Sequence, residues 1–171
     1  MPIAELEDPI APESRYGIDG KWDLGIGLWF EGVVTHQRNP ALVVPHQRTV
    51  TVGADYTFAV GSGLYVLAEY FALDQSRRLL GGGDGARLTA ALVRYPLSLL
   101  DSLSAIVYID TTRDVSYRFV SWQRTYDRWQ LFVMGFWNPP GGSLYQAQQT
   151  SRAGQNPLTG RGVQLMAVFN H

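Results

Sequence analysis

Hydrophobic and polar residues alternate along most of this chain. From 18 to 34 nearly every even position is apolar or glycine, whereas the odd positions include Asp19 and Lys21. Successive side chains of a β-strand point to opposite faces, so a period of two predicts a strand with one apolar face. The alternation is unbroken over this stretch, and it predicts one continuous strand there.

The same alternation recurs further along the chain with decreasing clarity. The segments that carry it or are strongly aromatic are 49–58, 64–70, 87–97, 103–110, 116–124, 129–138 and 161–170. Together they predict about eight strands and no helix. Short connections between consecutive strands favour an all-β, antiparallel up-and-down sheet, which must close into a barrel or cover its edges.

The connections between these strands differ in length at the two ends of the predicted sheet. Long connections (37–47, 74–86 and 139–160) and one brief one (111–114) fall at one end, and tight turns (61–63, 98–101 and 125–128) fall at the other. Short turns at one end and long loops at the other are typical of transmembrane β-barrels of bacterial outer membranes.

The aromatic residues predict two belts, as at the two interfaces of a membrane barrel. Near the short turns we place Trp22, Phe58, Tyr65, Tyr95, Tyr126, Trp129 and Phe169. Near the long loops we place Phe30, Tyr70, Phe71, Tyr108, Tyr117, Phe136 and Trp137.

The amino-acid composition agrees with membrane strands in which apolar and polar residues alternate. Charged residues make up 17% of the 171 positions, against about 25% in typical soluble domains. Mean hydropathy is nevertheless only −0.08, and no stretch approaches the roughly 20 apolar residues of a membrane helix. A strand needs an apolar residue only at every second position, so one face can suit lipid while the average stays near zero.

Charge and cysteine content exclude other classes. The formal net charge is −1, which argues against a protein built to bind nucleic acid. There is no cysteine, hence no disulfide framework, thiolate metal site or thiol nucleophile.

Taken together, the chain resembles bacterial outer-membrane β-barrel proteins of the porin-like kind. The resemblance covers 16–171 as the barrel domain and leaves 1–15 as an N-terminal extension. The final strand is similar to the terminal recognition signal of such barrels, with Gly162 followed by Leu165, Ala167 and Phe169, although it ends on Asn170-His171 instead of the aromatic residue.

The resemblance implies a Gram-negative outer-membrane location. It also implies the lipid bilayer and the barrel-assembly machinery as partners, with small solutes and further copies of the chain as additional candidates. The segments 21–29 and 63–70 are similar to closing strands of larger porin-like barrels. The first residues have no positive start and no apolar stretch, which fits both a mature small barrel and a part of a larger one.

The polar face of the alternation predicts a set of lumen-facing charges. These residues are Lys21, Asp23, Glu31, Asp55, Glu69, Arg87, Asp110, Arg118 and Arg124. Acids dominate the early strands and arginines the later ones, so in a narrow barrel we expect them to pair across the lumen. In a wider barrel the same groups would line a channel and bias which solutes pass.

Two similar triplets flank the first long loop and predict a cluster at its mouth. His36 and Arg38 precede the loop, and His46 and Arg48 follow it. Two imidazoles suit a metal and two arginines suit a phosphate or a sugar acid, whereas the plainer interpretation is a polar rim at the lipid headgroups. Two histidines are too few for us to predict a metal site, and no cofactor is expected.

We therefore expect porin-like passage of small solutes or a passive membrane scaffold. The alternative is a soluble lipocalin-like barrel that binds a small apolar ligand inside. A lesser alternative is an outer-membrane lipid-modifying enzyme, which needs a serine and a histidine within hydrogen-bond reach. No His-x-Ser sequence is present, and the glycines of 81–85 lack the Lys-Ser/Thr of a phosphate-binding loop, so no enzymatic activity is expected.

Overall fold

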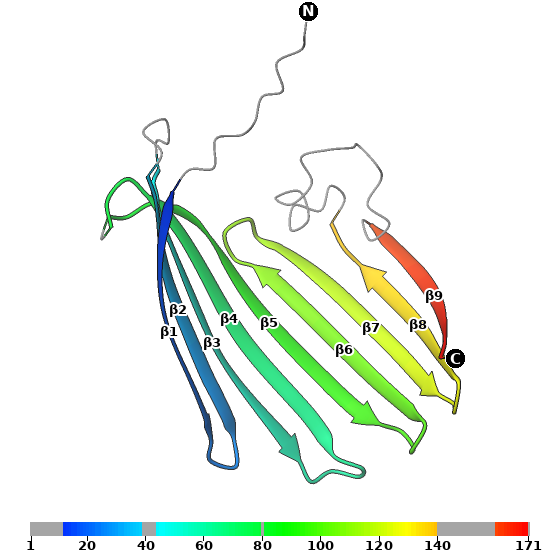
Figure 1. The fold of residues 1–171 in the computed structure, drawn as a ribbon. Helices are drawn as coiled ribbons and strands as arrows, with labels where there is room; N and C mark the ends of the chain where they lie inside the picture. The colour runs from blue at the N-terminus through cyan, green and yellow to red at the C-terminus, as the bar shows by residue number, and fades with distance from the viewer. Residues whose placement is uncertain (1–11, 39–43, 80, 140–159, 171) are drawn as a thin grey trace, which may run out of the picture.

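The computed structural model describes residues 12–38, 44–79, 81–139 and 160–170, and these residues form a single antiparallel sheet (Figure 1). Its strands are β1 (Glu13–Asp23), β2 (Gly27–Gln37), β3 (His46–Phe58), β4 (Leu64–Ser76), β5 (Asp84–Pro96), β6 (Asp101–Asp110), β7 (Val115–Thr125), β8 (Trp129–Trp137) and β9 (Arg161–Phe169). Each strand pairs with the next, which confirms the all-β, up-and-down prediction. Within the described ranges no helix is long and apolar enough to cross a membrane.

The described residues contain nine strands where the alternation predicted about eight, because the first predicted strand is a hairpin. β1 ends at Asp23 and β2 begins at Gly27, with Gly25 at φ +83° in the turn between them. Trp22 pairs with Leu28, and both are even positions. The alternation therefore continues in phase through the turn and does not reveal it.

The predicted asymmetry of the connections is present in the structure. The turns 24–26, 59–63, 97–100 and 126–128 lie at one end of the sheet, and the strand ends that the connections 38–45, 77–83, 111–114 and 138–160 join lie at the other (Figure 1). The tight turn after β3 uses Gly61 and Gly63 at positive φ, as their residue type predicts. We refer to the two ends as the short-turn end and the long-loop end.

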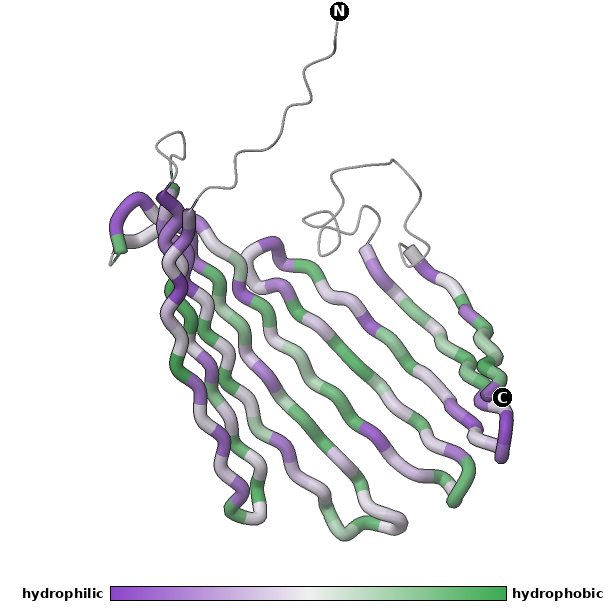
Figure 2. Tube along the Cα trace, viewed as in Figure 1, coloured by the Kyte–Doolittle hydropathy of each residue, from purple (hydrophilic) through white to green (hydrophobic). Residues whose placement is uncertain are grey.

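The pairing register assigns the strand residues to two faces, because directly paired residues point to the same side of a sheet. The convex face carries most of the exposed large hydrophobic residues of the strands. These are Tyr16, Ile18, Trp22, Leu28, Val50, Val52, Tyr56, Phe58, Tyr70, Val93, Leu103, Ile109, Val120, Trp129, Trp137, Val163, Leu165 and Phe169. Figure 2 shows the alternation that produces this face, with hydrophobic and hydrophilic positions interleaved along the strands.

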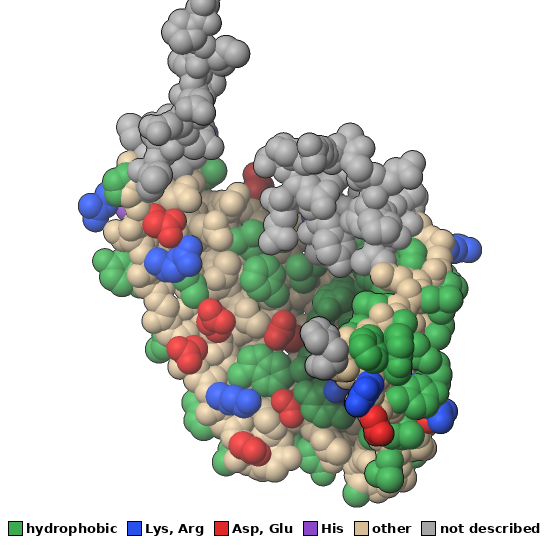
Figure 3. Space-filling view, turned by 45° about the vertical axis from the view of Figure 1, so that its right-hand side comes forward, with side chains coloured by type: hydrophobic (Ala, Val, Ile, Leu, Met, Phe, Trp, Pro, Cys, Tyr) green, Lys and Arg blue, Asp and Glu red, His purple; other side chains and the backbone are tan. Residues whose placement is uncertain are grey.

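The opposite, concave face differs between its two halves. Over β1–β4 it is polar and charged, whereas over β5–β8 it carries large apolar residues, namely Leu88, Leu92, Ile106, Tyr108, Tyr117, Phe119, Phe132, Met134 and Phe136. Figure 3 shows the sheet hollowed between these halves, with acidic groups towards one side and hydrophobic groups towards the other. Tyr117 and Phe136 are only 1% and 5% exposed and form the small core of this hollow.

Five of the seven aromatic residues predicted near the short turns form a belt on the convex face, whereas Tyr65 lies on the concave face and Tyr126 lies in the turn between β7 and β8. Trp22, Phe58, Tyr95, Trp129 and Phe169 lie on the convex face near the short-turn end, and Trp129 and Phe169 are in ring contact at 4.7 Å.

The second predicted belt is not formed as expected. Phe30 stacks on Trp22 at the short-turn end, with ring centroids 5.6 Å apart, because the undetected hairpin places it there. Four of its other members lie on the concave face, namely Phe71, Tyr108, Tyr117 and Phe136. Tyr70 and Trp137 lie on the convex face, as does Phe30.

The strands are strongly staggered, and the sheet stays open. One row of paired residues begins at Trp22, beside the short turn of β1, and ends at Arg161, the first residue of β9 at the long-loop end. Such a stagger is what a tilted barrel wall requires. β1 and β9 each have one paired neighbour and do not pair with each other, so the barrel predicted from the sequence is not closed.

Candidate functional sites

The charged half of the concave face is built by β1–β4. Six residues of the predicted lumen set lie on the concave face, namely Lys21, Asp23, Glu31, Asp55, Glu69 and, on β6, Asp110. Asp19 shares this face because it pairs with Glu31. Lys21, Asp23 and Asp55 line a shallow pocket of about 270 Å³ near the short-turn end.

Two glycines make room for large side chains on this half. A Cβ at Gly53 would overlap the indole of Trp29, and one at Gly27 would come within 2.7 Å of the Asp55 carboxylate. With Gly53 beneath it, the Trp29 side chain crosses β3, and its Nε1 donates a hydrogen bond of 3.3 Å to the Glu69 carboxylate. The sequence predicted Glu69 on this face but not its bond to Trp29.

The arginines predicted to line the lumen do not share this face. Arg87, Arg118 and Arg124 pair with Ala72, Val107 and Asp101 on the convex side, so the predicted pairing of early acids with late arginines across a lumen is wrong for these three. In β5–β8 large apolar residues lie on the concave face, so hydrophobicity does not identify the outer face of these strands. The assumption that apolar residues face outward therefore misplaced the three arginines.

The three arginines have local contacts instead. Arg87 forms an ion pair of 2.6 Å with Asp74, and Arg124 forms one of 3.5 Å with Asp101. The backbone nitrogen of Arg118 donates to the Asn138 side chain at 3.2 Å. These contacts join neighbouring strands near the two ends of the convex face.

Asp110 is a turn residue as well as a concave-face residue. Its side chain is fully buried and accepts hydrogen bonds from the backbone nitrogens of Thr112 and Arg113, at 2.9 and 3.0 Å. The Arg113 guanidinium forms an ion pair with it at 3.2 Å. Asp110 thus stabilises the β6–β7 turn, where Asp114 has a positive φ.

The structure brings the predicted loop-mouth residues together on the convex face at the long-loop end. His36 and His46 are directly paired, and their rings stack with centroids 4.4 Å apart and planes at 23°. Each ring has a buried Nδ1 that lacks a hydrogen-bond partner among the described residues. An unsatisfied buried nitrogen of this kind costs roughly 1–3 kcal/mol.

Two arginines flank the stacked imidazoles. Arg48 donates from Nη2 to the Gly81 carbonyl at 2.8 Å, and Arg38 donates to the Ser14 hydroxyl at 3.2 Å. A groove of about 530 Å³ runs over this cluster. It is lined by Ser14, Tyr16, Val34, His36, Arg38, His46, Arg48 and Leu79.

Ser14 and Ser76 extend the histidine pair into a row of four across β1–β4. Ser14 pairs with His36, and Ser76 pairs with His46. The Ser14 hydroxyl accepts from Arg38, and the Ser76 hydroxyl donates to the Arg78 carbonyl at 2.5 Å. Both hydroxyls thus bond to groups other than an imidazole, and the arrangement is not that of a serine nucleophile with its base.

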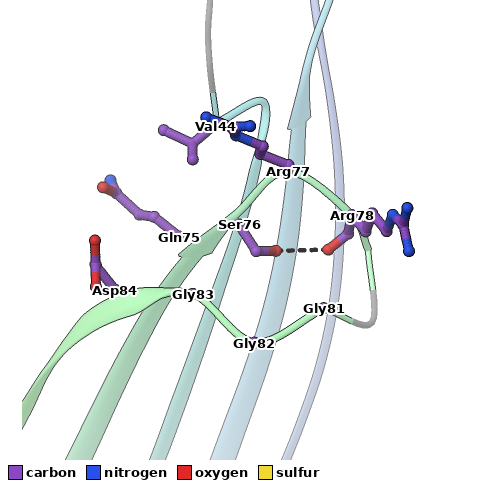
Figure 4. Close-up of a pocket in the computed structure, with 9 residues that line it drawn as sticks. All are labelled: Val44, Gln75, Ser76, Arg77, Arg78, Gly81, Gly82, Gly83 and Asp84. Atoms are coloured by element: carbon purple, nitrogen blue, oxygen red, sulfur yellow. Dashed lines mark hydrogen bonds between the residues drawn. The ribbon is translucent and has the colours of Figure 1, made fainter.

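A neighbouring pocket lies within the β4–β5 connection (Figure 4). It measures about 680 Å³ and is lined by Val44, Gln75, Ser76, Arg77, Arg78, Gly81, Gly82, Gly83 and Asp84. A Cβ at Gly83 would overlap the Gln75 carbonyl, so glycine lets the two backbones approach closely there. Arg77 and Arg78 are exposed and add positive charge beside the loop-mouth cluster.

No metal site emerges from these clusters. Among the residues that the structure describes, no three or more histidine, aspartate and glutamate side chains are grouped as metal ligands would be. His171, the third histidine of the sequence, lies outside the described residues, as does most of the predicted loop 139–160.

Comparisons with protein-family models, with curated proteins and with solved structures each gave no match to this chain.

Proposed function

We propose that this chain forms part of the wall of a transmembrane β-barrel of the bacterial outer-membrane type, whose concave face lines a passage for small solutes. The observation that carries the proposal is the apolar character of the convex face. Its apolar side chains extend over all nine strands, and each of its charged residues lies within four residues of a strand end.

The exposure of these side chains supports lipid contact. Val163 and Leu165 on β9 are 71% and 75% exposed, and Ile18 on β1 is 67% exposed. A soluble lipocalin-like barrel turns a polar outer face to water, whereas the convex face of this sheet carries exposed apolar side chains on all nine strands. Exposed apolar surface on such a scale marks an interaction with lipid or with another protein.

The length of the strands also fits a membrane. They contain nine to thirteen residues, and a tilted strand of about 9–11 residues spans the hydrocarbon core. The stagger from Trp22 to Arg161 supplies the tilt. The aromatic belt at the short-turn end then lies at one membrane interface, where such rings are enriched.

The charges of the concave face indicate which solutes the passage favours. Its acidic residues on the strands are Glu13, Asp19, Asp23, Glu31, Asp55, Glu69, Asp84 and Asp110, and its basic ones are Arg15, Lys21 and Arg94. A ring of carboxylates favours cations, so we expect cations to pass more readily than anions. If the closed barrel is too narrow for a passage, the same wall acts as a scaffold.

Membrane insertion is tested with two neighbouring residues on opposite faces. Val52 lies at the middle of the convex face and Thr51 at the middle of the concave face. A charge on the lipid face near the bilayer centre costs about 2–4 kcal/mol, so Val52→Lys should lower the folded fraction in lipid vesicles strongly, and Thr51→Lys should not. Folding is followed by the mobility of unboiled samples on gels and by denaturant titration.

Equal effects of the two substitutions, or full solubility of the unmodified chain as a monomer without detergent, would contradict the membrane proposal. Conductance across a planar bilayer then tests the passage, with a reversal potential that shows cation preference as the expected result. Glu31→Gln should reduce that preference. Absence of conductance at every voltage would contradict the passage of solutes and leave only the scaffold function.

A further inference from the structure

The loop-mouth cluster has the composition and position of a lipid headgroup site. We propose that the groove formed by His36, His46, Arg38 and Arg48 binds the phosphate of an anionic lipid, with the acyl chain along the apolar part of the groove. This inference rests on the proposed function, because insertion of the convex face into a membrane places its long-loop end at the level of the lipid headgroups.

The groove is amphipathic in the way that a phospholipid requires. Its polar side chains come from the last pair of β2 and β3 and from the residues beside it. Its apolar lining comes from Tyr16, Val34 and Leu79. Tyr16 and Val34 are paired with each other two residues closer to the sheet centre than His36, and Arg48 pairs with Val34 in the same row. Apolar contacts therefore lie beside Arg48 and beneath the two histidines.

The charges around the groove suit an anion. Arg38, Arg48, Arg77 and Arg78 lie in or beside it, whereas Asp74, the acid that pairs with Arg48 across the strands, is already engaged by Arg87. Asp84 lies in the neighbouring pocket. Guanidinium groups bind phosphate oxygens through charge-assisted hydrogen bonds, often two at a time.

The unsatisfied nitrogens point to the same ligand chemistry. His36 Nδ1, His46 Nδ1 and Arg48 Nε are buried and lack hydrogen-bond partners among the described residues. Both histidines and Arg48 line the groove, and imidazole and guanidinium N–H groups donate hydrogen bonds to phosphate oxygens. An occupant with acceptor oxygens would therefore supply hydrogen-bond partners to side chains that have unsatisfied nitrogens.

The stacking of the two rings disfavours a metal ion as the occupant. The lone pairs of an imidazole lie in the plane of its ring. Two planes at 23° with centroids 4.4 Å apart lie beside each other and do not converge on one point. A metal site also needs further ligands, and none is grouped with these histidines among the described residues.

Basic side chains continue along the same rim and provide a matched control. Arg118 and Arg161 lie on the convex face near the long-loop end, in β7 and β9. Neither lines the groove. Loss of these two arginines removes as much positive charge from this end as loss of Arg38 and Arg48.

The test compares two double variants of the full chain in non-ionic detergent micelles. Binding of a short-chain phosphatidic acid is measured by titration calorimetry, with circular dichroism to verify β-structure. Arg38→Gln with Arg48→Gln should weaken binding about tenfold, equivalent to about 1.4 kcal/mol, and Arg118→Gln with Arg161→Gln should change it less than about twofold. His46→Gln alone provides a second, milder groove variant if the double variant does not fold, and it should weaken binding as well.

Three results would overturn the proposal. Equal losses in the two double variants would show general attraction to a basic surface. Equally tight binding of a short-chain phosphatidylcholine would show that the phosphate charge is not recognised, and equally tight binding of inorganic phosphate would show a site for free anions. Micelle binding does not require insertion into a bilayer, so its failure is distinguishable from failure of Val52→Lys and Thr51→Lys to differ in vesicles.

Discussion

At the scale of single residues, the contact of Trp29 with Glu69 depends on the absence of a side chain at Gly53. A Cβ there overlaps the indole, so Gly53→Ala should displace Trp29 and break the 3.3 Å hydrogen bond from its Nε1. We expect the free energy of unfolding to fall by about 1–3 kcal/mol, as for other overpacked sites. Denaturant titration measures this loss.

A double-mutant cycle isolates the cause of that loss. In a Trp29→Ala background the added methyl group meets no indole, so Gly53→Ala should then cost almost nothing. Gly82→Ala is a control, because a Cβ at Gly82 has no heavy atom within 4 Å among the described residues and no positive φ. A full loss of stability in the Trp29→Ala background would attribute the effect to the backbone of β3.

Residue-level prediction from the sequence placed the acidic residues of β2–β4 on the observed face and the arginines of β5 and β7 on the wrong one. Glu31, Asp55 and Glu69 were placed on one face because their neighbours along the strand are hydrophobic. In β5 the apolar Leu88 faces the concave side and its neighbours Arg87 and Thr89 face the convex side, so the rule that apolar residues face outward assigned Arg87 to the wrong face. Such an assignment requires the register, which only the paired strands provide.

At the scale of elements, the β1–β2 hairpin shows a second limit of pattern reading. Trp22 and Leu28 are separated by an even number of positions and share a face, so the turn leaves the alternation unchanged. Gly25, the residue with φ +83°, was the available signal. A single glycine in a sequence that also has Gly20, Gly27 and Gly32 did not distinguish a turn from a strand position.

The left-handed backbone of Gly25 makes this turn testable. Positive φ costs about 1–2 kcal/mol for a residue with a Cβ, and more for a branched one. Gly25→Val should therefore destabilise the β1–β2 hairpin and speed amide exchange in β1. Gly25→Asn is the matched control, since asparagine tolerates this region, and it should retain most of the stability. Equal exchange in the two variants would show that the turn conformation is not required.

At the scale of the whole molecule, the direction of the two edge strands governs how the sheet can close. β1 and β9 both run from the long-loop end to the short-turn end (Figure 1). Pairing between them, within one chain or between copies related by an axis along the barrel, would be parallel. Bacterial single-chain barrels have an even number of antiparallel strands, so closure of that kind requires an odd number of additional strands between β9 and β1.

The edge strands should therefore be exchange-labile when the chain is folded alone. β4 and β5 are paired on both sides, whereas β1 and β9 are each paired on one side. Amide hydrogen exchange in vesicles should show rapid exchange in β1 and β9 and strong protection in β4 and β5, since opening free energies follow local hydrogen bonding. Protection of β1 and β9 equal to that of β4 would mean that both edges have found a pairing partner. A short thiol cross-linker between Ile18→Cys and Leu165→Cys, in a chain with no native cysteine, would then distinguish a seam within one chain from one between two copies.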